Sequence, residues 1–184
     1  MKLYYKSEFL SLNPKQSDIN VTDSENNVQY IISGNKAAFG RKVRIMNVSG
    51  SEAALIEQKF SLFVLKFKIK VGEKEFTFRL KHQANGALYF KTDDNNWSST
   101  GNLRDASYTI VSQTGSEFTV NKLNTNDNGA TDTSLIGKIE NAYNKMTTAV
   151  VREISGNADT YSSEVLALAI ASDMAAAADN NVSY

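Results

Sequence analysis

The sequence contains no cysteine, one histidine and one proline in 184 residues. Without cysteine the chain forms no disulfides, thiolate metal sites or cysteine nucleophiles, and it suits a reducing compartment. Because His82 is the only histidine, metal sites that use several histidines and catalysis by paired histidines are excluded. Pro14 lies in the entry segment, clear of the expected strands.

The sequence also lacks an excess of charge of either sign. Lysine and arginine number 20, as do aspartate and glutamate, so the net charge is zero. We therefore expect no nucleic-acid partner, and attraction to a membrane would require a local patch. Lysines at positions 2 and 6 interrupt the apolar run that a signal peptide needs, which predicts a cytoplasmic protein.

Catalytic and nucleotide-binding motifs are absent too. No Gly-x-Ser-x-Gly elbow accompanies His82, which we expect at the surface, and no phosphate-binding glycine loop occurs. We expect no enzymatic activity, no catalytic residues, no cofactor and no bound metal.

Short apolar runs alternate with turn residues from Lys2 to about Ile154, which predicts an antiparallel sandwich or barrel within a single domain of residues 1–184. Strands are expected near residues 18–22, 28–33, 43–48, 53–59, 64–71, 74–81, 87–91, 107–113, 117–123, 134–140 and 148–154.

One hairpin can be aligned residue by residue. A type II′ turn at Gly72-Glu73 places Val71 opposite Lys74, and the pairing then continues to Leu65 opposite Leu80. One face of this hairpin is apolar and the other almost wholly polar. Since a slip by one residue would bury the lysines, the register is strongly specified.

The C-terminal segment changes character and predicts a helix over about residues 162–178. From Val165 to Ala171 it is apolar on every side, as in a helix that is buried all round. The uninterrupted run is too short to span a bilayer, and Asp173 would cost on the order of 3 kcal/mol there. We expect a helix inside a β shell, with its large side chains buried: Val165, Leu166, Leu168, Ile170 and Met174.

Several stretches together resemble a known family. They are residues 1–4, 38–45, 47–59, 65–69 with the turn at Gly72, Trp97 with 108–110, and 164–173. In this order they resemble the LURP-one-related family, in particular its small bacterial members, which belong to the tubby C-terminal-like superfamily. The resemblance implies a mainly β fold, a closed antiparallel barrel of about 12 strands (residues 1–154) around a buried hydrophobic C-terminal helix.

The resemblance also implies functions of relatives, namely phosphoinositide binding by tubby proteins and lipid scrambling proposed for phospholipid scramblases. A scramblase is not favoured, because there is no cysteine to palmitoylate and residues 155–160 do not look like the calcium segment of that family.

Basic residues on the polar face of the hairpin are the main site candidates. Like charges directly opposite each other destabilise a sheet, which hints at a docking surface for phosphate headgroups or another polyanion. Alternatively, this is a solvated face whose lysines discourage edge pairing. The candidates are Lys66, Lys68, Lys70, Arg79 and Lys81, with a smaller second cluster of Arg41, Lys42 and Arg44.

Three other features have ordinary structural interpretations. The Asn-rich segment 124–132 predicts a hairpin loop, because a calcium loop starting there would have Asn124 in place of its first aspartate and Leu135 in place of its twelfth-position glutamate. Residues 93–96 predict a polar turn. Trp97 either seals one end of the barrel or lines a ligand rim.

The sequence thus favours a non-enzymatic binding or scaffold module, with anionic lipid headgroups or a protein as the partner. We expect it in the cytoplasm, peripheral to the inner membrane face. A carrier of a small apolar ligand is the alternative, followed by a hydrolase without a recognisable motif. The sequence leaves the oligomeric state open.

Overall fold

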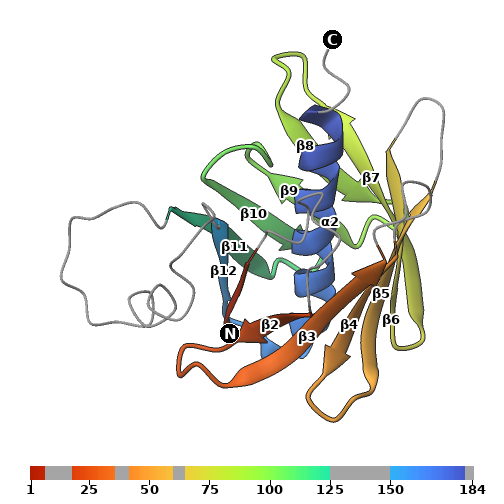
Figure 1. Cartoon of the computed structure of the whole chain (residues 1–184). Helices are drawn as coiled ribbons and strands as arrows, with labels where there is room; N and C mark the ends of the chain where they lie inside the picture. The colour runs from red at the N-terminus through yellow and green to blue at the C-terminus, as the bar shows by residue number, and fades with distance from the viewer. Residues whose placement is uncertain (7–17, 36–41, 60–64, 125–149, 181–184) are drawn as a thin grey trace.

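The computed structural model describes residues 1–6, 18–35, 42–59, 65–124 and 150–180. In these residues twelve strands form a closed antiparallel barrel, and one long helix runs through it (Figure 1). The mainly β prediction, with a barrel and one C-terminal helix, is therefore confirmed.

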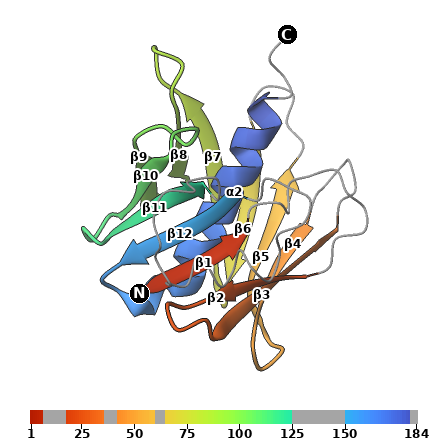
Figure 2. The ribbon, with the colours of Figure 1, turned by 60° about the vertical axis from the view of Figure 1, so that its left-hand side comes forward.

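Each strand pairs with its neighbours in the sequence, and the last strand returns to the first. Figure 2 shows β1 between β12 and β2, where the barrel closes. The strands are β1 (Lys2–Lys6), β2 (Ile19–Thr22), β3 (Val28–Asn35), β4 (Lys42–Asn47), β5 (Glu52–Lys59), β6 (Lys66–Val71), β7 (Lys74–His82), β8 (Leu88–Thr92), β9 (Trp97–Thr100), β10 (Ser107–Ser112), β11 (Glu117–Asn124) and β12 (Val150–Gly156). The 3-10 helix η2 (Asp159–Tyr161) leads into α2 (Ser162–Asn180).

The sequence did not predict β1 or β9. In β1 the consecutive residues Leu3, Tyr4 and Tyr5 are all buried, so the alternation that marks a strand is missing. In β9 serine and threonine follow Trp97, and buried Ser99 accepts a hydrogen bond from the Phe90 N–H. The predicted strand at 134–140 lies outside the described residues.

The β6–β7 hairpin has the predicted register. Val71 pairs with Lys74 and Lys66 with Arg79, and the Leu80 N–H donates to the Leu65 carbonyl oxygen at 3.2 Å. Gly72 has a φ of +58°. Such a φ strains residues with a Cβ, which is why a type II′ turn prefers glycine at this position.

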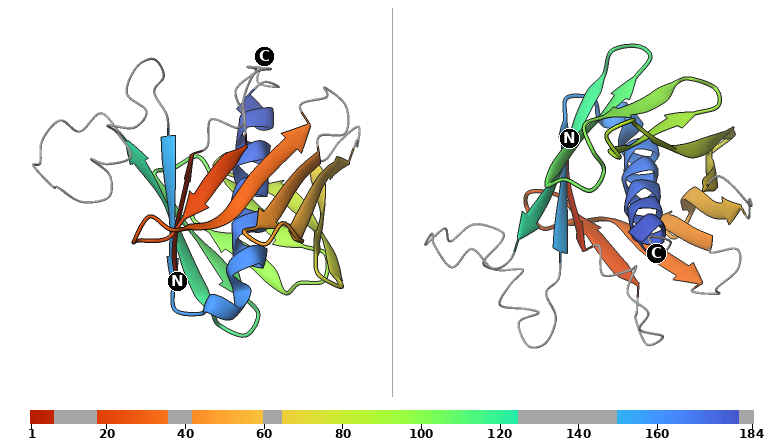
Figure 3. Two further views of the ribbon diagram at one scale, coloured as in Figure 1. Left: turned by 60° about the horizontal axis from the view of Figure 1, so that its bottom comes forward. Right: turned by 90° about the horizontal axis from the view of Figure 1, so that it is seen from above.

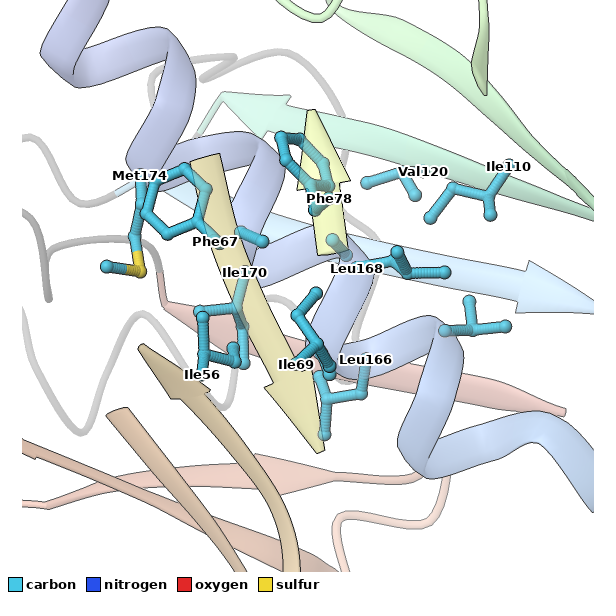
Figure 4. Packing of buried hydrophobic residues seen from close by; sticks show 14 of the residues in the cluster. Ile56, Phe67, Ile69, Phe78, Ile110, Val120, Leu166, Leu168, Ile170 and Met174 are labelled. Carbon is cyan, nitrogen blue, oxygen red and sulfur yellow. The ribbon is translucent and has the colours of Figure 1, made fainter. Parts of the chain in front are cut away.

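Helix α2 fills the interior of the barrel. In the view from above (Figure 3, right) strands surround it, and it contacts β5, β6, β7 and β10. Leu166, Leu168 and Ala171 are completely buried, and so are the residues between them except Ile170, at 3% exposed. In Figure 4, Leu168 points toward strand side chains on the opposite side from those near Ile170. The prediction of a helix buried on all sides is confirmed.

A buried polar link joins the middle of the helix to the barrel wall. Asp173 of α2 is 2.5 Å from the Arg152 guanidinium of β12, and it accepts a 2.7 Å hydrogen bond from the Tyr5 hydroxyl of β1. Burial raises the pKa of the Asp173 carboxyl, and the Arg152 charge opposes this rise. Within the described residues, Arg152 Nε and Nη1 make no hydrogen bond, so the desolvation of Arg152 is only partly offset.

This link predicts an asymmetric response to mutation. Asp173→Asn should lower the free energy of unfolding by about 3–5 kcal/mol, because it leaves a buried guanidinium without its counter-ion. The double variant Arg152→Met with Asp173→Leu should recover most of that loss, since no unpaired charge remains. Urea unfolding of the three variants measures both effects, and a double variant as unstable as Asp173→Asn would contradict the prediction.

A second prediction concerns Gly156 in β12. A Cβ at this position would lie 2.2 Å from Cδ1 of Phe118, a ring that is fully buried and packed 6.1 Å from Trp97. Gly156→Ala should therefore lower the free energy of unfolding by about 1–3 kcal/mol. Adding Phe118→Leu should relieve the clash, so thermal denaturation should show a double variant more stable than the two separate losses imply. Simple additivity would disprove the clash.

Candidate anion-binding site

A row of four basic residues crosses four adjacent strands. Lys59 of β5 pairs with Lys66 of β6, Lys66 with Arg79 of β7, and Arg79 with Lys91 of β8. We call Lys59, Lys66, Arg79 and Lys91 the basic row. Neighbouring strands lie about 4.8 Å apart, so the four Cα positions span about 15 Å.

The core determines the direction in which the basic row points. Along their strands, three of its members stand next to Phe67, Phe78 and Phe90, all completely buried. Phe67 packs edge-on against Phe78 at 5.6 Å, and Phe78 stacks on Phe90 at 4.6 Å. Successive strand residues face opposite sides of the sheet. The aromatic cluster inside therefore places the cations on the outer surface.

The next row toward the β6–β7 turn is different, because its basic residues are paired with carboxylates. Lys42 lies 2.6 Å from Glu57, and Lys68 lies 2.9 Å from Glu75. Hydrogen bonds from Lys42 and then from Lys59 lower the pKa of the Glu57 carboxyl to about 2, so this acid is ionised at neutral pH. This second row therefore carries no unpaired positive charge.

The row beyond that one also places cations near carboxylates, and we call these two rows the balanced rows in that sense. Lys70 stands opposite Glu75 in the ladder, and Arg44 lies 3.3 Å from Glu52. Glu75 thus serves two lysines, because it is also the carboxylate that Lys68 contacts. The basic row differs from these two rows in that its cations stand on adjacent strands with no carboxylate between them, and on its far side Lys81 stands opposite Tyr89.

Most of the basic row lacks counter-ions. Lys59 is 2.7 Å from Glu57, a carboxylate that it shares with Lys42. Lys66, Arg79 and Lys91 form no ion pair within the described residues. At least three positive charges therefore stand side by side without compensation.

The structure brings the predicted candidates together only in part. Lys66 and Arg79 belong to the basic row and Lys81 adjoins it, whereas Lys68 and Lys70 lie in the balanced rows. In the second cluster, Lys42 and Arg44 are paired with Glu57 and Glu52, and Arg41 lies outside the described residues.

Sequence reasoning missed Lys59 and Lys91. The Gly86 turn and the alternation around Phe90 could have revealed Lys91, since they set its register opposite Arg79. Lys59 had no comparable signal, because the segment between β5 and β6 contains no turn motif.

The remaining candidates have structural roles. Residues 93–96 form a polar turn, in which Asp93 accepts a 2.7 Å hydrogen bond from the Thr77 N–H and Asn95 has a φ of +59°. Segment 124–132 lies outside the described residues beyond Asn124. Among the residues described, no group of three acidic or histidine side chains could hold a metal ion.

Trp97 and His82 lie at separate places. Trp97 is buried and packs edge-on against Tyr161 at 5.4 Å, so it closes the barrel where the chain enters α2, as one of the two predictions stated. His82 is mostly exposed, as predicted, and its Nε2 lies 3.4 Å from Asp179.

Comparison with known proteins gave one match. A family model described as LURP-one-related matches residues 1–173. Searches of the curated proteins and of the solved structures found no matching protein. Among the described helices, none has both the length and the apolar character needed to cross a membrane.

The basic row should destabilise the isolated protein. Arg79→Thr relieves like-charge repulsion from Lys66 and Lys91, so it should raise the free energy of unfolding by about 0.5 kcal/mol at low salt. Salt should erase this gain by screening the exposed charges. The matched control is Lys70→Thr, which removes a cation opposite Glu75 and should bring no gain. Equal effects of both changes in urea titrations would show that the row is not repulsive.

Proposed function

The chain belongs to the LURP-one-related family, and from this premise we propose that it is a non-enzymatic binding module that docks anionic phospholipid headgroups on its basic row. The observation that carries the proposal is the line of Lys66, Arg79 and Lys91, which share no counter-ion within the described residues. Phosphate oxygens accept charge-assisted hydrogen bonds from such side chains.

The expected strength of binding is modest. Each basic residue close to an anionic bilayer contributes about 1 kcal/mol. Three or four such residues therefore give a reversible, salt-sensitive interaction. This suits a peripheral protein, and we place the chain in the cytoplasm with contact at the inner membrane face. The absence of cysteine supports that location, because it suits a reducing compartment.

We also propose a finer place within the family. The barrel closed around a buried helix supports membership of the tubby C-terminal-like superfamily. The opening residues 1–4 and the helix segment 164–173 support the bacterial branch.

The other hypotheses have less support. An apolar ligand would have to displace helix side chains such as Leu166 and Leu168, which already fill the interior. A hydrolase that used His82 as its base would need a nucleophile beside it, whereas the contact that His82 makes, with Asp179, supplies a carboxylate and no nucleophilic hydroxyl. An acidic protein partner would use the same basic row as a membrane does.

The proposal predicts sedimentation with anionic vesicles. The wild-type protein should pellet with phosphatidylcholine vesicles that contain phosphatidylglycerol, and not with pure phosphatidylcholine. Lys66→Glu reverses one charge in the basic row, so it should weaken binding by about 2 kcal/mol, or about thirtyfold.

The matched control is Lys70→Glu, which makes the same charge change on the same strand in a balanced row. It should leave binding close to that of the wild type, and circular dichroism should show that both variants are folded. If the wild type pellets equally with anionic and neutral vesicles, or with neither, docking to anionic headgroups is wrong.

A further inference from the structure

We infer that the basic row responds to the charge density of a membrane made of singly charged headgroups, and does not recognise the stereochemistry of one multiply phosphorylated headgroup. This inference rests on the proposed function and specifies its ligand. Three features of the row lead to it: its shape, its side chains and its surroundings.

The first feature is shape. The four Cα positions lie in a line about 15 Å long, on four of the twelve strands of a closed barrel. Side chains stand roughly perpendicular to a sheet, so on the outer, convex surface of a barrel their heads diverge. A site for a single headgroup needs donors that converge on it. A diverging line instead contacts several phosphates at different points.

The second feature is the choice of side chains. Three of the four residues are lysines, whose ammonium groups act as mobile point charges on flexible stems. Only Arg79 has the planar fork that binds a phosphate in two places at once. One fork in a line of point charges gives little geometric selectivity, and the attraction then depends on the number of charges.

The third feature is the surroundings. On the side toward the β6–β7 turn, Lys42 and Lys68 are already paired with Glu57 and Glu75. A headgroup with several phosphates would place at least one phosphate next to Lys42 and Lys68. Both of these lysines already contact a carboxylate, so that phosphate would gain little. On that side the basic row therefore offers a single line of cations, which fits a layer of headgroups with one phosphate each.

The first test compares two kinds of vesicle at equal total negative charge. One contains phosphatidylglycerol in phosphatidylcholine, and the other contains phosphatidylinositol 4,5-bisphosphate in phosphatidylcholine. The wild-type protein should bind both within about twofold, and soluble inositol trisphosphate should not displace it. Raising the salt from about 0.15 M to about 1 M shortens the Debye length from about 8 Å to about 3 Å and should abolish both interactions.

The second test separates charge from geometry. Arg79→Lys keeps the charge and removes the fork, so affinity for the phosphatidylglycerol vesicles should stay within about twofold. Lys66→Gln and Lys91→Gln should each weaken binding about fivefold, which corresponds to about 1 kcal/mol per charge. Lys70→Gln, in a balanced row, is the control and should leave affinity unchanged.

The outcomes distinguish the two proposals. A preference above about tenfold for the bisphosphate vesicles, displacement by inositol trisphosphate, or a large loss with Arg79→Lys would overturn the charge-density inference and leave headgroup docking standing. If neither vesicle binds, or if Lys66→Gln and Lys70→Gln behave alike, both proposals fail.

Discussion

The burial of α2 within the barrel is the constraint on which the rest of the structure depends. A barrel of about eight strands has an interior just wide enough for its own side chains, and twelve strands enclose more space. The helix fills that space with completely buried residues such as Leu166 and Leu168, each of which contributes roughly 1.5–3 kcal/mol. Asp173 is one of the buried polar residues of the helix, and its contacts with Arg152 and Tyr5 hold the helix to two strands that lie far apart in the sequence.

The filled interior also determines the outer surface. Phe67 and Phe78 must face the helix, so the alternation of strand residues places Lys66 and Arg79 opposite each other outside. A slip by one residue would exchange phenylalanines for cations in the core, which is why the repulsive pairing is not relieved by a change of register. Core packing therefore fixes the register that places these cations opposite each other, so their repulsion cannot be relieved by a shift of the strands. Threonine on the outer face would avoid it, and the presence of cations in three adjacent strands favours a role in binding.

A feature could be predicted from the sequence when the residues that determine it are close together in the chain, and not when they are brought together by the fold. The β6–β7 register could be worked out because Gly72 fixes the turn and both strands alternate cleanly. Lys59 could not be placed, since no turn motif between β5 and β6 sets the register of their pairing. Asp173 was visible only as a charge unsuited to a bilayer, because its partner Arg152 lies on a strand brought close by the fold.

The distribution of charge bears on how a neutral protein would bind an anionic surface, as we propose, in one orientation. Positive and negative residues are equal in number, so at distances beyond the Debye length of about 8 Å an anionic surface attracts the molecule very little. Within that distance Glu57 and Glu75 offset part of the positive charge of the balanced rows, while Lys66, Arg79 and Lys91 act together. Attraction thus appears only when this face is turned toward the surface. Net neutrality with local segregation therefore selects an orientation, which a uniformly basic protein would not do.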